Sequence, residues 1–160
     1  MRVGVLSDTH IPSRAPRVPA RVFEVFDGVD LLLHAGDVSI RATLDELSAL
    51  APVHTVAGNI DDPSLRAALP TELRIDLEGT RVGMVHDSGA SKGRRERMRR
   101  RFPGCRVVVY GHSHMPAVED RDGFMLLNPG SACDPRRAKV PTVAILEIAG
   151  GEVSAELVFL

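Results

Sequence analysis

The chain has 160 residues, about the length of one domain, so we expect a single domain over residues 1–160. Its 44% hydrophobic and 26% charged residues are typical of a globular chain and exclude a disordered or fibrous protein. The formal net charge of −1 argues against a domain that binds nucleic acid over its whole surface. No apolar run approaches the roughly 20 residues of a membrane helix, so we expect no membrane partner. Two cysteines, Cys105 and Cys133, predict no disulfide framework, and the cytoplasm is the expected location.

Strands and helices alternate in the N-terminal half. Short apolar runs predict buried strands at residues 3–6, 30–34 and 53–57. Apolar residues at helical spacing predict helices at residues 18–26 and 40–51, and Ser39 is a suitable N-cap for the second helix. This order predicts parallel strands joined by right-handed crossovers.

Hairpins dominate the C-terminal half. Three are predicted, at residues 72–77 with 81–86, 117–121 with 124–127, and 142–148 with 153–159. Helices are expected at residues 63–69 and 91–101, and a further strand at residues 107–110. Parallel units followed by hairpins predict an α/β fold in which two packed mixed β-sheets are flanked by helices.

Polar residues with metal-binding side chains stand at the ends of five of the predicted strands. They are Asp8 and His10, Asp37, Asn59, His86, and His112 with His114. Because ligands of open α/β sheets bind beyond the carboxyl ends of the strands, we expect these side chains to meet. Carboxylate, imidazole and amide donors suit Mn, Fe, Zn, Ni or Mg rather than soft metals.

The number of donors predicts two metal ions. Seven candidates are too many for one four- to six-coordinate ion, and a carboxylate such as Asp37 can bridge two cations about 3.5–4 Å apart. The pairs Asp8–His10 and His112–His114 each point the same way only if the backbone between them is extended. Glycines at positions 36, 58 and 111 allow tight turns around the site.

The same segments, in the same order, resemble the motifs of the calcineurin-like metallophosphoesterase superfamily. They are Asp8-Thr9-His10, Gly36-Asp37, Gly58-Asn59-Ile60-Asp61, His86 and Gly111-His112-Ser113-His114. The short chain and the segment Asn128-Pro129-Gly130-Ser131 are most similar to the small YfcE-type phosphodiesterases, a subgroup that also contains Vps29-like scaffolds. The resemblance spans residue 3 to about residue 148 and implies two packed sheets flanked by helices.

The resemblance implies a role for each candidate. The first metal ion would be bound by Asp8, His10, Asp37 and His114, and the second by Asp37, Asn59, His86 and His112. It also implies a metal-bridging hydroxide as the nucleophile, and Asp37, Asn59 and His86 are the expected catalytic residues. Manganese is the expected metal, with nickel, iron, zinc or magnesium as alternatives.

Two positions depart from the family pattern. Many members carry histidine at the position of Ile60, where it assists the leaving group, although YfcE-like members commonly lack it. Asp87 stands directly after His86, where glycine is usual. Its carboxylate would either hold a candidate ligand or narrow the access of the substrate.

Other polar residues are expected to have structural roles, and some have a second interpretation. His34 and His54 lie within apolar strand runs and are expected to be hydrogen-bonded core residues. Asp61 is expected either to orient Asn59 or to cap the following helix. Residues 128–131 predict a turn, and the resemblance adds a position beside the metals.

The arginine-rich segment at residues 92–101 predicts either a solvated helix face or a positive rim that steers a phosphorylated substrate. Arg136 and Arg137 are candidates for a phosphate contact or a structural salt bridge. Cys105 and Cys133 are expected to be packing residues.

The function that best fits the sequence is a metal-dependent phosphodiesterase acting on a small or nucleotide-like phosphate ester. The alternatives are a Vps29-like protein-binding scaffold with weak or no catalysis, and a phosphomonoesterase or nuclease of the same fold. A homo-oligomer is left open.

Overall fold

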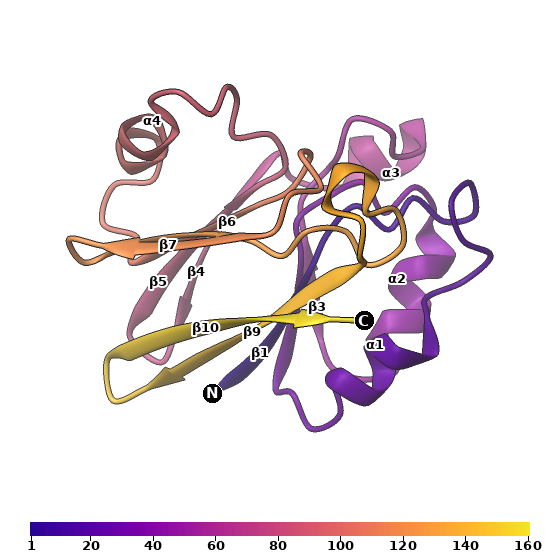
Figure 1. Ribbon diagram of the computed structural model, residues 1–160, viewed down its shortest axis with the longest axis horizontal. Helices are drawn as coiled ribbons and strands as arrows, with labels where there is room; N and C mark the ends of the chain where they lie inside the picture. Colours follow the sequence, from indigo (N-terminus) through magenta and orange to yellow (C-terminus); the bar gives the residue numbers. More distant parts are fainter.

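The first sheet begins with the N-terminal half of the chain (Figure 1). The computed structural model describes all 160 residues, and this half contains β1 (Arg2–Leu6), α1 (Ala20–Val25), β2 (Leu31–His34), α2 (Arg41–Ser48), β3 (Val53–Thr55) and α3 (Pro63–Ala68). The three strands are parallel, with Val3 opposite Leu31 and Leu32 opposite Val53. The predicted parallel β-α-β-α-β unit is therefore confirmed, and its helices are shorter than predicted.

The second sheet follows, and the last hairpin returns to the first sheet. The remaining elements are β4 (Glu72–Leu77), β5 (Thr80–Val85), α4 (Arg94–Arg101), β6 (Val107–Tyr110), β7 (Ala117–Arg121), β8 (Phe124–Asn128), η1 (Arg136–Ala138), β9 (Thr142–Ala149) and β10 (Glu152–Phe159). The strand orders are β10-β9-β1-β2-β3 and β4-β5-β6-β8-β7. All three predicted hairpins are present, and both sheets are mixed because β9 runs antiparallel to β1 and β5 runs parallel to β6.

The two sheets pack face to face, with helices on both outer faces (Figure 1). Val3 and Val5 of β1 pack against Val107 and Val109 of β6 in a central cluster of 16 buried residues. The outer face of the first sheet packs against α1 and α2, and that of the second sheet packs against α4 through Met98. The predicted sandwich of two mixed sheets flanked by helices is confirmed. None of the helices is both long and apolar enough to cross a membrane.

Two local predictions are wrong. Ser39 does not cap α2, because the helix begins after Ile40 and the Ser39 N–H donates instead to Asp61 Oδ1 at 2.7 Å. His54 is exposed rather than buried, since β3 forms the edge of its sheet and no strand covers its far side. Cys105 and Cys133 are free, and burial raises the pKa of both thiols.

Candidate metal centre

The seven candidate residues meet at the carboxyl ends of five strands. The residues and the strands that they follow are Asp8 and His10 after β1, Asp37 after β2, Asn59 after β3, His86 after β5, and His112 and His114 after β6. β1, β2 and β3 are mutually parallel, as are β5 and β6, so their carboxyl ends gather at one edge of each sheet. The interatomic distances show that the two edges adjoin.

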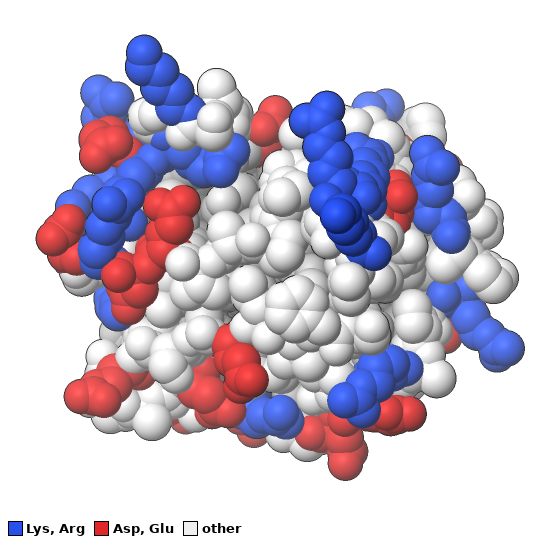
Figure 2. Space-filling view, in the orientation of Figure 1, with Lys and Arg blue, Asp and Glu red and all other residues white.

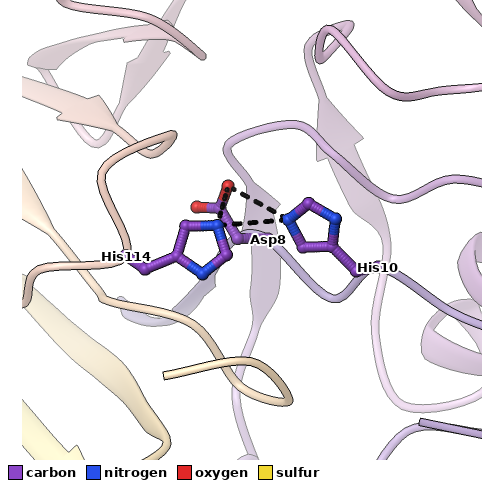
Figure 3. A group of neighbouring side chains, drawn as sticks. All are labelled: Asp8, His10 and His114. Atoms are coloured by element: carbon purple, nitrogen blue, oxygen red, sulfur yellow. Dashed lines mark hydrogen bonds and ion pairs between the residues drawn. The ribbon is translucent and has the colours of Figure 1, made fainter. Parts of the chain in front are cut away.

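Asp8, His10 and His114 form the buried group (Figure 3). The Nε2 atoms of His10 and His114 lie 3.7 and 3.4 Å from Asp8 Oδ1, and 3.2 Å from each other. All three residues are buried, and Asp8 Oδ1 has no hydrogen-bond partner. Burial of a carboxylate oxygen without a partner costs free energy of folding. A cation bound by this group would supply the missing partner.

Asp37, Asn59, His86 and His112 form the open group. His86 Nε2 lies 3.2 Å from Asp37 Oδ2 and 3.1 Å from Asn59 Oδ1. His112 Nδ1 lies 2.9 Å from the same Asn59 oxygen. Unlike the buried group, the open group includes two exposed residues, Asn59 and His112.

Asp37 lies between the two groups. Its Oδ2 atom is 3.6 Å from His10 Nε2 in the buried group and 3.2 Å from His86 Nε2 in the open group. Its Oδ1 atom accepts a hydrogen bond of 2.9 Å from the Ile60 N–H. A single carboxylate therefore faces both groups, which is the position that a bridging ligand requires.

Main-chain carbonyls orient two of the histidines. The Nδ1–H of His86 donates to the Ala35 carbonyl at 2.8 Å, and that of His114 donates to the Asp134 carbonyl. Because a carbonyl can only accept, Nδ1 carries the proton, and Nε2 of the neutral ring presents a lone pair to a carboxylate. Metal-binding histidines are held in this way in most metalloproteins.

The backbone at the Asp8–His10 and His112–His114 pairs is not extended, so the condition under which alternation alone would point both members of a pair the same way is not met. Five candidates have positive φ angles: Asp8 (54°), His10 (51°), Asp37 (56°), His112 (66°) and His114 (57°). Asp and His enter this region more readily than most residues, and each such conformation costs about 1–3 kcal/mol. Hydrogen bonds between the strand-end loops, such as the Asp8 N–H to the Gly36 carbonyl at 3.0 Å, hold these loops in place.

Two glycines permit the loops to approach the carboxylates. A Cβ atom at Gly58 would lie 2.1 Å from Asp37 Oδ1, and one at Gly111 would lie 2.0 Å from Ser7 Oγ. Neither residue has a positive φ, so the requirement is close approach, whereas Gly36, at φ 90°, provides the tight turn that was expected.

Neighbouring polar residues brace these loops. Asp61 accepts from the N–H groups of Ser39 and Gly58, both at 2.7 Å, so it orients the loop that contains Asn59 and does not cap α3. The turn at residues 128–131 lies beside the centre, since Ser131 Oγ donates to the Asp8 carbonyl at 2.7 Å.

His34 lies behind the centre and is a core residue, as predicted. Its side chain is fully buried, and its Nε2 lies 3.2 Å from Thr9 Oγ1. Burial lowers the pKa of His34 to about 4, so the ring is neutral near pH 7.

Burial and neighbouring charges set the charge states within the two groups. Burial lowers the pKa of His114, although Asp8 opposes this effect. For His86, burial is outweighed by Asp37 and Asp8, which raise the pKa overall. For Asp37, burial is outweighed by the hydrogen bond and charge of His86, which lower the pKa. An ionised Asp37 and a neutral His114 are the forms that bind metal ions.

The arginine-rich segment binds main-chain carbonyls of the protein. Arg95 is buried and donates to the Phe124 carbonyl at 2.8 Å, and Arg97 donates to the Ser88 carbonyl at 2.7 and 2.9 Å. Arg99 donates to the Asp122 carbonyl at 2.7 Å. α4 is therefore tied to its neighbours by guanidinium groups, a role that neither prediction included.

A side pocket of about 390 Å³ opens from the open group. Its lining includes Asn59, His86 and His112, together with Arg66, Asp87 and Arg101. Asp87 does not hold a candidate ligand: its Oδ1 accepts from the Gly89 N–H at 2.7 Å, and its side chain is exposed to the pocket. Arg136 forms an ion pair of 3.2 Å with Asp134, which supports the salt-bridge reading for that residue.

Comparison with known proteins agrees with this geometry. A model of the calcineurin-like phosphoesterase superfamily domain matches residues 1–151. A probable metallophosphoesterase from Methanothermobacter thermautotrophicus is 39% identical over 160 residues, which cover 99% of this chain and 92% of that protein. A phosphodiesterase from Methanocaldococcus jannaschii is 24% identical over 92% of this chain and 93% of that protein.

Among solved structures, Vps29 from Chaetomium thermophilum has a TM-score of 0.81 to this chain at 20% identity. The match covers 99% of this chain and 94% of that one. At this level of identity the likeness concerns the fold.

Proposed function

Because the chain belongs to the calcineurin-like phosphoesterase superfamily, we propose that it hydrolyses phosphodiesters at a centre of two divalent metal ions. The name of the Methanocaldococcus relative supports the diester class. The substrate would be a small or nucleotide-like phosphate ester.

The donor set fits two divalent ions. The unpartnered Asp8 Oδ1 is a buried anionic atom that a cation would satisfy. The Nε2 lone pairs of His86 and His114 face carboxylate oxygens at 3.2 and 3.4 Å, a repulsive arrangement unless a proton or a cation lies between them. The mixture of carboxylate, imidazole and amide donors suits manganese, with nickel, iron, zinc or magnesium as alternatives.

The observation that carries the proposal is the position of the Asp37 carboxylate between the two groups. In this assignment the first ion is held by Asp8, His10, Asp37 and His114, and the second by Asp37, Asn59, His86 and His112. Asp37 belongs to both sets because its Oδ2 atom lies within 3.6 Å of both His10 and His86.

When bound, two divalent ions activate a water as nucleophile and neutralise charge on the phosphate. The residues of this chain would hold the two ions in position. Asp37 would contact both ions through its carboxylate, whose Oδ1 atom accepts a hydrogen bond from the Ile60 N–H. Asn59 and His86 share a contact of 3.1 Å in the lining of the side pocket, where the substrate would bind.

The test is the hydrolysis of bis(p-nitrophenyl) phosphate by protein that is stripped with a chelator and then reloaded with Mn²⁺, Ni²⁺, Zn²⁺ or Mg²⁺. The proposal predicts loss of activity on stripping and recovery on reloading. Full activity of the stripped protein would contradict it. A parallel panel of phosphomonoesters and oligonucleotides separates the diesterase from a monoesterase or nuclease of the same fold.

A protein-binding scaffold is the second candidate, favoured by the likeness of the fold to Vps29. The presence of donors at all seven candidate positions favours the enzyme. A rate of phosphodiester hydrolysis that rises in proportion to the metal content of the protein would show that the protein is not only a scaffold.

A further inference from the structure

The side pocket is lined by residues of the open group and by two arginines. Arg66 on α3 and Arg101 at the end of α4 lie in its wall. The pocket's volume of about 390 Å³ falls within the range of about 300–1,000 Å³ that is typical of small-molecule sites. Asp87 is the one carboxylate in the lining, so its wall carries two positive charges against one negative charge.

Arg101 is held in place by the protein. Its Nε donates to Glu72 Oε1 at 2.6 Å, and its Nη1 donates to the Asp87 carbonyl at 3.4 Å. Its Nη2 makes no hydrogen bond within the protein, and the side chain is 37% exposed. A guanidinium that is fixed on one side and free on the other loses little entropy when it binds an anion.

Arg66 has no carboxylate partner. The only hydrogen bond of its side chain is from Nη1 to the Asn59 carbonyl at 3.3 Å, which places the guanidinium beside the loop of the open group. A free guanidinium next to a phosphoesterase centre is suited to a phosphate, since its planar N–H groups match two phosphate oxygens.

One face of the molecule carries an uneven distribution of charge. In the view of Figure 2, Lys and Arg gather in the upper half of the molecule, over α4 and around η1, whereas Asp and Glu lie mostly along the left and lower edges. η1 lies close to the candidate centre, because Arg136 pairs with Asp134, whose carbonyl accepts from His114 Nδ1. Positive charge around η1 therefore favours the approach of an anion to the centre.

We propose that Arg66 and Arg101 form a subsite for a second phosphate, so that the preferred substrates are phosphodiesters that carry a further phosphate group. The inference rests on the proposed function for the reaction, and it adds the substrate class. The scissile phosphate lies at the open group, and the second phosphate lies in the side pocket between the two guanidinium groups.

Binding is measured by calorimetric titration with thymidine 3′,5′-bisphosphate and with thymidine 5′-phosphate, each with and without Mn²⁺. The wild type should bind the bisphosphate at least about tenfold more tightly, a difference of about 1.4 kcal/mol. Arg66→Gln and the double variant with Arg101→Gln should bring that ratio toward one. Asp87→Asn should raise it, because it removes the one negative charge in the wall.

Arg100→Gln is the matched control. Arg100 is the neighbour of Arg101 on α4 and is exposed outside the pocket lining, so its loss should leave the ratio unchanged. Thermal unfolding of each variant checks the fold, and Arg66→Gln breaks no ion pair, so it tests the subsite even where Arg101→Gln is destabilised. An affinity ratio near one in the wild type, or a ratio that Arg66→Gln does not lower, would overturn the inference.

Kinetics separate this inference from the proposed function. The substrates are thymidine 5′-(p-nitrophenyl phosphate) and its 3′-phosphorylated form, which have the same leaving group. A kcat/KM preference for the 3′-phosphorylated ester that Arg66→Gln abolishes supports the subsite. Hydrolysis of both esters at equal rates overturns the subsite and keeps the diesterase. Tighter bisphosphate binding without hydrolysis of either ester keeps the subsite and rejects the diesterase.

Discussion

The two halves of the candidate centre differ in how they meet solvent. The buried group is closed: Asp8, His10 and His114 are 0%, 4% and 1% exposed, and Asp8 Oδ1 has no partner. The open group ends at His112, which is exposed and borders the side pocket. Under the proposed function, the buried group would retain an ion and the open group would contact the substrate.

Removal of the residue that the two halves share should have the largest effect. Asp37→Ala deletes a candidate ligand from both groups. Loss of a residue that only supports a metal ligand typically costs up to about 100-fold in activity, so the rate of hydrolysis of bis(p-nitrophenyl) phosphate should fall by more than this factor. Metal analysis should show that both ions are depleted. Asp45→Ala, which removes an exposed carboxylate on α2, is the control. Near-normal metal content and rate in Asp37→Ala would show that the halves do not share this residue.

The side chain at position 60 cannot act as an acid for the leaving group. Ile60 is 42% exposed and cannot transfer a proton, and a positioned acid contributes about 10²–10⁴-fold. Rates for a series of aryl phosphodiesters should therefore fall steeply as the pKa of the leaving phenol rises. Ile60→His should flatten the dependence if its side chain reaches the leaving oxygen. A flat dependence in the wild type would reveal another acid.

The buried side chain of His34, which lies behind the candidate centre, should make the metal-free protein less stable at acid pH. Burial lowers the pKa of His34 to about 4, whereas the unfolded chain binds a proton near pH 6.5. Between these values the unfolded state binds more protons, so the contribution of His34 is complete above pH 6.5 and is lost as the pH falls toward 4. At 1.36 kcal/mol per pH unit the loss is about 3 kcal/mol.

Urea unfolding at pH 4.5 and pH 7, in the presence of a chelator, measures this loss. His34→Asn should reduce the difference in unfolding free energy between the two pH values. His54→Asn removes an exposed histidine and should leave the difference as it is in the wild type. Equal behaviour of the two variants would mean that burial of His34 does not control the acid sensitivity.

Substitution of Asp61 tests whether its hydrogen bonds hold the loop that contains Asn59 in position. Asp61→Asn weakens the bonds to the Ser39 and Gly58 N–H groups, so we expect a loss of about 10–100-fold in kcat, with the fold retained. Asp62→Asn, at the next residue, is the matched control, because Asp62 is exposed and its side chain makes no cap hydrogen bond. Equal activity of the two variants would remove Asp61 from the supporting contacts.

The sequence predicted which residues lie together at the candidate centre, but it did not predict the backbone conformation at those residues. Placement after parallel strands was enough to bring Asp8 and His114 together, although they are 106 positions apart in the sequence. The left-handed conformations of these residues depend on hydrogen bonds between loops that are distant in the chain, and spacing alone contains no signal for those bonds.

Sheet order and long side chains limited the other predictions. His54 was expected to be buried because its run is apolar, and only the strand order shows that β3 is an edge. Arg66 was not recognised as a pocket residue, whereas Arg101 belongs to the segment 92–101 that was predicted to be either a solvated face or a positive rim. The two residues follow strands of different sheets, so the sequence did not show that they line one pocket. A basic residue seven positions after Asn59 was the one available signal for Arg66.

The most direct test of the central claim is electron paramagnetic resonance of the protein loaded with Mn²⁺, together with metal analysis. Two ions bridged by Asp37 at about 3.5–4 Å should give two Mn per chain and an exchange-coupled spectrum. That coupling should disappear in Asp37→Ala and persist in Asp45→Ala. One Mn per chain, or two uncoupled ions in the wild type, would contradict a centre whose closed and open halves share one carboxylate.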